Sequence, residues 1–136
     1  MGDKEQQRKK NAGAENKTEP LSIDRSKLDA LQELQVEGEP SILEQVISIY
    51  LKNSESFVNT LQSALDSHDM ETMHNTAHSF QSSSATVGAM KLAELNKKLE
   101  VDCRQNILED PAEMVAAISK EYIFVKNALS KDLPLL

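Results

Sequence analysis

Residues 69–88 read DMETMHNTAHSFQSSSATVG, and this stretch decides the fold. It opens on Asp69, a residue type that caps helix starts, and it closes on Gly88, a residue type that ends helices. Between these two ends, apolar or small residues recur at intervals of three and four: Met73, Ala77, Phe80, Ser84 and Val87. This spacing predicts one helix that buries a single face.

The segment before this stretch predicts a longer helix that runs to about Ser67. Its start carries Ser41 and Glu44, the capping-box pair in which each side chain satisfies an unpaired backbone donor. Its apolar stripe skips only at Ser54. The stripe consists of Leu43, Val46, Ile47, Tyr50, Phe57, Val58, Leu61 and Leu65.

Two further helices are predicted after Gly88. The first carries an apolar stripe of Leu92, Leu95, Leu99 and Cys103. The second starts at Asp110-Pro111-Ala112-Glu113, which combines a cap, a proline at the first helical position and an early glutamate. Its predicted buried face consists of Val115, Ile118, Tyr122, Val125 and Leu129.

A short helix with Leu28, Leu31 and Leu34 on one side is predicted near the N-terminus, with Asp24 or Ser26 as its cap. Gly38-Glu39-Pro40 then breaks the chain. No alternating strand pattern occurs, and the connections are short, so consecutive helices should run antiparallel. The predicted fold is all-α: an antiparallel up-down four-helix bundle, with the short N-terminal helix packed across one end.

Residues 1–20 differ from the rest because they contain no Val, Ile, Leu, Phe, Tyr or Cys. Such a segment cannot bury enough apolar surface to become ordered, so we expect a flexible polar linker or tail. The folded domain is predicted over residues 21–134, with Pro134 closing it.

Charge and composition exclude several classes of protein. The 136 residues carry a formal net charge of −7, whereas binding to nucleic acid or to an anionic membrane surface requires a basic face. No stretch approaches the roughly 18 apolar residues of a membrane span. The single cysteine, Cys103, excludes an internal disulfide, and its place on an apolar stripe predicts an inert core thiol. These features indicate a soluble intracellular protein.

Two histidines on one predicted helix are the strongest candidates for chemistry. His74 and His78 are four residues apart and therefore share a face. This is metal-ligand spacing, but Asn75 stands where the zinc-protease pattern needs a glutamate, and no third ligand is evident. A metal-binding bundle nevertheless remains one alternative function for this pair of histidines.

His78 also has the features of a nucleophile. It lies beside the buried stripe, toward solvent, and its helical neighbours Gln81, Ser82 and Ala85 are small or polar. A neutral imidazole, with an ordinary pKa of about 6.5, is a competent nucleophile near neutral pH. On spacing alone, an ordinary surface histidine is the better explanation of the pattern. Nearby, Ser84 is expected to pack in the core and to bond back to the preceding turn, and Ser83 is expected to do the same.

The segment Ala77–Ala89, AHSFQSSSATVGA, resembles the phosphorylation segment of histidine-containing phosphotransfer (HPt) domains. That family pattern is roughly A-H-x-L-K-G-S-S-x-x-x-G-A. The resemblance continues into KLAELNKKLE downstream and into LDALQEL and ILEQVISIYLKN upstream, and covers about residues 21–130. The residues that match the pattern are Ala77, His78, Ser83, Ser84, Gly88 and Ala89, with Phe80 in place of the usual Leu.

The resemblance implies a phosphorelay carrier and not an enzyme. In this reading, His78 is the phosphoacceptor: it takes a phosphoryl group from a receiver-domain aspartate and passes it to another receiver. The expected partners are receivers of response regulators and of a hybrid sensor histidine kinase. The chain would need no cofactor of its own, because the Mg²⁺ would belong to the partner receiver domain.

Two positions depart from the family pattern. Gln81 stands where the family has a lysine that helps to neutralise the phosphoryl charge, and Ser82 stands where a glycine keeps the approach open. Both are expected to support the phosphoryl group less efficiently. His74, Asn75 and Ala85 flank His78 at helical spacing and are the expected docking residues, together with part of the preceding helix.

One alternative from another class follows from these departures: a helical adaptor that docks receivers with weak or no phosphotransfer. For either function, we expect the protein to be monomeric and to lie in the cytoplasm. It would be either free-standing or the C-terminal domain of a membrane-bound hybrid kinase.

Overall fold

Five α-helices and no strand make up the part of the chain that the computed structural model describes, residues 23–107 and 109–131. The helices are α2 (Arg25–Gln32), α3 (Ile42–Ser67), α4 (Met70–Thr86), α5 (Met90–Gln105) and α6 (Pro111–Ser130). The all-α prediction is confirmed. The predicted tail over residues 1–20 and the predicted closure at Pro134 lie outside the described residues.

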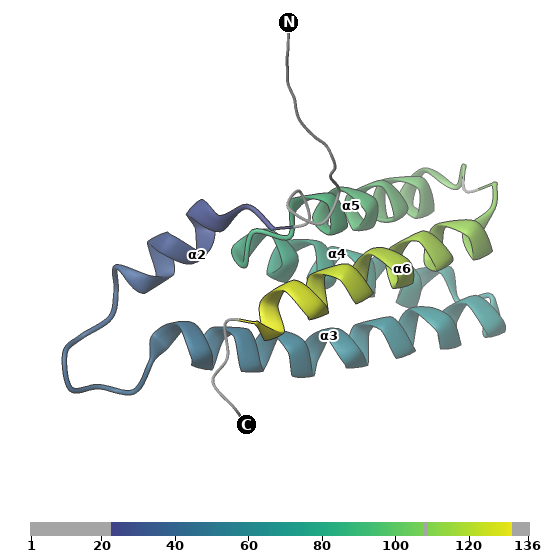
Figure 1. Cartoon of the computed structure of the whole chain (residues 1–136). Helices are drawn as coiled ribbons and strands as arrows, with labels where there is room; N and C mark the ends of the chain where they lie inside the picture. The colour runs from purple at the N-terminus through teal and green to yellow at the C-terminus, as the bar shows by residue number, and fades with distance from the viewer. Residues whose placement is uncertain (1–22, 108, 132–136) are drawn as a thin grey trace, which may run out of the picture.

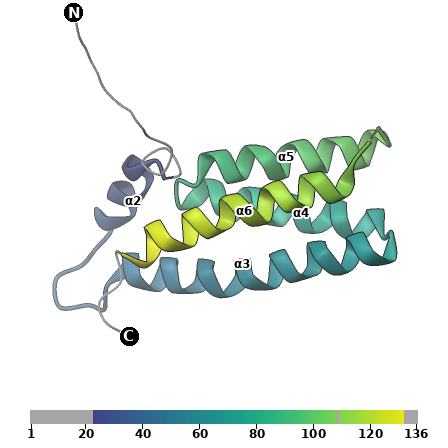
Figure 2. The ribbon, with the colours of Figure 1, turned by 45° about the vertical axis from the view of Figure 1, so that its right-hand side comes forward.

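The four longer helices form an up-down bundle, as predicted. α4 packs between α3 and α5, and α6 closes the ring by packing against both α5 and α3. The short connections make successive helices antiparallel, and α2 lies at one end of the bundle, where it contacts α3 (Figures 1 and 2). None of the helices within the described ranges has the length and apolar character needed to cross a lipid bilayer.

Side-chain caps explain where four of the helices begin. In each case a carboxylate or hydroxyl oxygen accepts a hydrogen bond from a backbone N–H of the first turn, which would otherwise be unpaired. The capping residues are Asp24 for α2, Ser41 for α3, Asp69 for α4 and Asp110 for α6. Ser41, Asp69 and Asp110 were predicted from the sequence, and Asp24 was one of the two caps proposed for the first helix.

The core lies along the axis of the bundle and is built from the predicted faces. Phe80 of α4 is fully buried, and its ring centroid lies 5.4 Å from that of Phe57 in α3 and 6.1 Å from that of Tyr122 in α6. Leu99 of α5 is also fully buried. The predicted buried positions of α4 and α6 are all confirmed.

Three details of the predicted faces were wrong. Leu34 is 63% exposed, because α2 ends at Gln32 and the chain has already left the helix there. Ser54 interrupts the apolar sequence but not the buried face, since it lies four residues after the buried Tyr50 and is itself buried. Cys103 is half-buried, because it lies two residues from the end of α5, beyond the well-packed part of the bundle.

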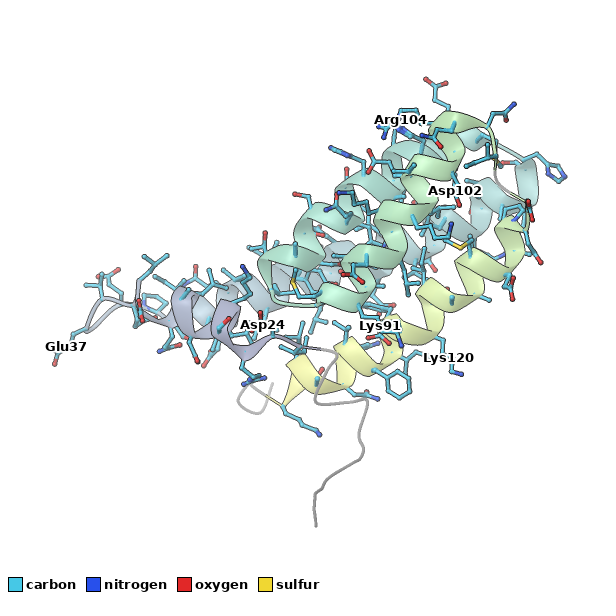
Figure 3. All side chains as sticks on the ribbon, turned by 90° about the horizontal axis from the view of Figure 1, so that it is seen from above. Asp24, Glu37, Lys91, Asp102, Arg104 and Lys120 are labelled. Carbon is cyan, nitrogen blue, oxygen red and sulfur yellow. The ribbon has the colours of Figure 1, made fainter. Side chains whose placement is uncertain are left out.

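The connection between α4 and α5 also holds the N-terminal helix. The backbone N–H of Asp24 donates to the carbonyl oxygen of Gly88 over 2.6 Å. Gly88 has a φ of +85°, and a Cβ at this position would collide with the backbone of Asp24. Glycine is therefore required here for both its conformation and its size. Asp24 lies at the bundle end of α2, whereas Glu37 lies at the far tip of the connection to α3 (Figure 3).

Candidate functional site

α4 presents His78 on its solvent side because its opposite side is fixed in the core. Ala77 and Phe80 are fully buried on either side of His78 in the sequence. The backbone of the helix is therefore immobilised around a side chain that packs little. The imidazole of His78 is 64% exposed, in agreement with the sequence prediction that it lies beside the buried stripe.

The neighbouring helix α5 supplies a carboxylate to this histidine. Glu100 Oε2 lies 2.9 Å from His78 Nδ1, within hydrogen-bonding distance. The two partners differ in exposure, because the side chain of Glu100 is only 11% exposed. A largely buried carboxylate therefore contacts one edge of an exposed ring. The rest of the imidazole stays open to an incoming partner.

Two more cationic or potentially cationic groups surround the same carboxylate oxygen. His74 Nε2 lies 3.8 Å from Glu100 Oε2, and a guanidinium nitrogen of Arg104 lies 3.7 Å from it. Both distances exceed those of a hydrogen bond, so the guanidinium of Arg104 interacts with the carboxylate through its charge alone. Figure 3 shows Arg104 at the end of α5 that lies away from Lys91. Lys98, another basic residue of α5, pairs instead with Asp102 over 3.0 Å.

The predicted site residues are distributed around His78 in two groups. Ser82 and Asn75 are exposed, whereas Gln81 and Ala85 are half-buried. The side chain of His74, a predicted docking residue, is 29% exposed, and its Nε2 lies on the side of Glu100. Its position one turn before His78 on the inner edge of the exposed face explains this orientation.

A shallow apolar groove runs between α3 and α4 on the side of His78 away from α5. Ile49 of α3 lines it and is 60% exposed. The groove extends the exposed part of α4 onto α3. Its lining residues are Val46, Ile49, Tyr50, Asn53, Ser83, Thr86 and Val87.

The serines next to His78 have structural partners. Ser83 donates to the carbonyl oxygen of Phe80 over 3.3 Å, which is the backward bond expected from the sequence. Ser84 is buried as expected, and its hydroxyl pairs with the phenol of Tyr50 in α3 at 2.8 Å. Burial raises the pKa of Tyr50, which keeps the phenol protonated and able to donate.

Cys103 lies near His74, in a second shallow depression with Met70, Glu71 and Arg104. Burial raises the pKa of its thiol, which keeps it in the unreactive protonated form. Within residues 23–107 and 109–131, no group of three or more histidine, cysteine, aspartate or glutamate side chains is arranged to hold a metal ion.

Glu100 is the site residue that was not assigned a role from the sequence. The distances of His78 and Glu100 from the turn between α4 and α5 could have indicated that the two residues are close. His78 precedes Gly88 by 10 residues and Glu100 follows it by 12 (88 − 78 and 100 − 88). Antiparallel helices rise equally per residue, so two positions nearly equidistant from the turn lie at nearly the same height. The spacing alone does not settle whether the two side chains face each other.

Comparison with known proteins yields one family and several relatives. The family model described as "Hpt domain" matches residues 45–130. Histidine-containing phosphotransfer protein 1 of Arabidopsis thaliana is 28% identical over 101 residues, which are 73% of this chain and 66% of that protein. Multistep phosphorelay regulator 1 of Schizosaccharomyces pombe is 27% identical over 116 residues, which are 81% of this chain but 39% of that protein.

A solved structure agrees with these matches. The crystal structure of histidine-containing phosphotransfer protein B from Pseudomonas aeruginosa superposes with a TM-score of 0.74 at 25% sequence identity. The superposition covers 82% of this chain and 93% of that one. The similarity therefore extends beyond α4 to the arrangement of the bundle.

Proposed function

Because this chain belongs to the Hpt domain family, whose members are phosphorelay carriers in two-component signalling, we propose that His78 is the residue that carries the phosphoryl group. Hpt proteins transfer phosphoryl groups and are not classical enzymes. The observation that carries the assignment is the exposure of His78, whose imidazole is 64% exposed on a helix that is otherwise fixed in the core. We also propose that the chain has no kinase activity of its own.

In the proposed reaction, an imidazole nitrogen of His78 attacks the phosphorus of a receiver's aspartyl phosphate in line with the departing carboxylate. The receiver contributes the Mg²⁺ that neutralises the developing charge. This chain contributes a nucleophile held at a fixed place on a rigid helix, so positioning is its main catalytic contribution. Transfer to a second receiver is the same step in reverse.

Incubation with a receiver that carries labelled phosphate tests this proposal. We expect the label to move to this chain, to be labile in acid and stable in alkali, and to map to His78. Binding of the receiver without transfer of label would instead support the receiver-docking adaptor. Absence of both, together with stoichiometric Zn²⁺ held by His74 and His78, would support the metal-binding alternative.

We propose that receivers dock across the groove between α3 and α4, with Ile49 as an apolar contact and Asn75 and Ala85 at its edge near His78. Protein interfaces bury a small apolar centre ringed by polar residues. The groove has this composition, since Val46 and Ile49 lie beside Asn53 and Thr86.

Ile49→Glu is expected to weaken receiver docking about tenfold or more, because it places a charge at the centre of an apolar contact. The loss should appear as a higher KM for the phosphorylated receiver, with the maximal transfer rate nearly unchanged. Ile123→Glu on α6 is the matched control, because Ile123 is 58% exposed on a helix that packs against α3 and α5. Equal losses in the two variants would contradict docking at this groove.

Gln81→Lys is expected to increase phosphoryl acceptance or the lifetime of phospho-His78 by about fivefold. The substitution replaces a neutral hydrogen bond with a charge-assisted one, worth roughly 1 kcal/mol more at a partly exposed site. Rates of label transfer and of label loss measure the two effects. A severalfold decrease with the fold intact would instead mean that Gln81 makes a specific contact with the partner.

Ser82 is proposed to affect the same step through its bulk, since it is exposed one turn after His78. The monomeric state, the cytoplasmic location and the attachment to a hybrid kinase remain predictions. Light scattering at two protein concentrations would measure the first of them.

A further inference from the structure

The proposed phosphorylation site brings negative charge next to a carboxylate. A phosphoryl group in transfer spreads its negative charge over three oxygens. Glu100 Oε2 lies 2.9 Å from His78 Nδ1, so a phosphoryl group on this ring has a carboxylate for a neighbour, and like charges repel. Gln81, one turn after His78 on α4, is neutral and half-buried. A cation from another helix would offset this repulsion.

The neighbouring helix α5 carries four basic residues, and three of them have an acidic partner. These pairs are Lys91 with Glu121, Lys98 with Asp102 and Arg104 with Glu100. Lys97 is the fourth basic residue. Its side chain is exposed, and within the part of the chain that the structure describes its ammonium group makes neither a hydrogen bond nor an ion pair. The charge of Lys97 is therefore available to an incoming anion.

The helical spacing places Lys97 on the side of α5 that faces His78. Positions three, four and seven residues apart lie on one side of a helix. Lys97 precedes Glu100 by three residues and Arg104 by seven (100 − 97 and 104 − 97). Glu100 contacts His78, and Arg104 approaches Glu100 along the same side. Lys98, the next residue, is rotated about 100° further away from this side.

The antiparallel arrangement of α4 and α5 brings Lys97 level with Gln81. From the contact between His78 and Glu100, three residues forward along α4 reach Gln81, and three residues back along α5 reach Lys97. Both steps run toward the turn at Gly88 and cover about 4.5 Å, because a helix rises about 1.5 Å per residue. The flexible four-carbon stem of a lysine allows its ammonium group to reach across to the neighbouring helix.

We propose that Lys97 supplies from α5 the positive charge that the family pattern places at Gln81 on α4, and that its ammonium group binds the phosphoryl oxygens of phospho-His78. This inference rests on the proposed function of His78. It adds the residue that neutralises the phosphoryl group, and it explains how a chain with a neutral Gln81 carries one.

Lys97 takes part in the chemical step through its charge and donates no proton. A lone pair of the His78 imidazole forms the N–P bond, and the P–O bond to the receiver's aspartate breaks with its electron pair returning to that carboxylate. The phosphoryl oxygens lose the receiver's Mg²⁺ when the two proteins separate. The three N–H donors of the Lys97 ammonium group then form charge-assisted hydrogen bonds to these oxygens.

The phosphoryl group reports a nearby cation through its own ionisation. A positive charge favours the more highly charged form and therefore lowers the pKa of the phosphoryl group. Phosphoramidate, a small phosphodonor, labels the protein without a receiver, and ³¹P NMR follows the titration of the signal that is absent from His78→Gln. Lys97→Met keeps an unbranched stem and removes the charge. We expect it to lower the acid dissociation constant of the phosphoryl group about threefold to fivefold.

Lys98→Met is the matched control. It removes the same charge from the next residue of α5, which is also exposed but pairs with Asp102 over 3.0 Å. We expect the phosphoryl group of Lys98→Met to titrate as in the wild type. Circular dichroism verifies that both variants keep their helices. A wild-type titration curve in Lys97→Met, or an equal change in the two variants, would overturn the proposal.

Phosphoryl transfer from a labelled receiver supplies the second readout. We expect Lys97→Met to accept label about threefold to fivefold more slowly than the wild type, and Lys98→Met to accept it at nearly the wild-type rate. Adding Gln81→Lys to Lys97→Met should restore the lost rate, because a lysine at either position serves the same phosphoryl group. Failure of the wild type to accept label would contradict the proposed function of His78. Normal labelling of the wild type, with no loss in Lys97→Met or no recovery in the double variant, would contradict only the role of Lys97.

Discussion

His78→Gln is expected to abolish phosphoryl acceptance from a phosphorylated receiver, leaving label at the background of a reaction without this chain. Glutamine retains a polar side chain of similar length but has no ring nitrogen with a free lone pair. The imidazole is 64% exposed, so its replacement leaves the core untouched and should shift the free energy of unfolding by no more than about 0.5 kcal/mol. Radiolabel transfer and thermal unfolding measure the two quantities.

The remaining histidines provide the controls. His68 follows the last residue of α3, and His74 turns its Nε2 toward Glu100, so neither shares the position of His78. His68→Gln should accept label at the wild-type rate, and His74→Gln should keep most of its acceptance. Label on His78→Gln at a rate comparable to wild type would place the acceptor on another residue.

Leu99→Ala is expected to lower the free energy of unfolding by about 2–5 kcal/mol, which is a large share of the stability of a domain this size. Leu99 is fully buried on α5. Its truncation loses the favourable free energy of transferring its methyl groups from water into the core, and it leaves a cavity in the bundle. Denaturant titration measures the loss, and the midpoint should fall while the slope of the transition is unchanged.

Leu34→Ala is the matched control for this substitution, because Leu34 is 63% exposed in the connection that follows α2. The same loss of methyl groups should change the stability there by no more than about 0.5 kcal/mol. A Leu99→Ala protein as stable as Leu34→Ala would mean that α5 presents a different face to the bundle.

The helices and their buried faces could be predicted because both depend on local rules. A capping residue acts on the three or four residues after it, and a buried stripe repeats with the period of the helix itself. Asp69 and Asp110 could therefore be assigned correctly without knowledge of any contact between helices. Leu34 was misassigned because an apolar residue at helical spacing does not show that the helix continues to it.

Contacts between helices could not be predicted in the same way. The helical period places Ser84 on the buried face, but its pairing with Tyr50 depends on how α3 and α4 are aligned. The position of Glu100 opposite His78 likewise depends on the rotation of α5 about its axis. A rotation of one residue, about 100°, would carry the carboxylate away from the imidazole. The candidate nucleophile was thus visible in the sequence, whereas the carboxylate beside it was not.

The bond between Asp24 and Gly88 determines where a fused protein would be tethered. Ile23 is buried and Asp24 is bonded to the end of α4, so a polypeptide attached before residue 23 is anchored at that end of the helix. The anchor lies 10 residues from His78, roughly 15 Å along the helix axis. A receiver joined there by a short flexible linker would experience an effective concentration near His78 on the order of millimolar. Linker length before residue 23 would then determine whether such a fusion transfers its phosphoryl group within one molecule or between molecules.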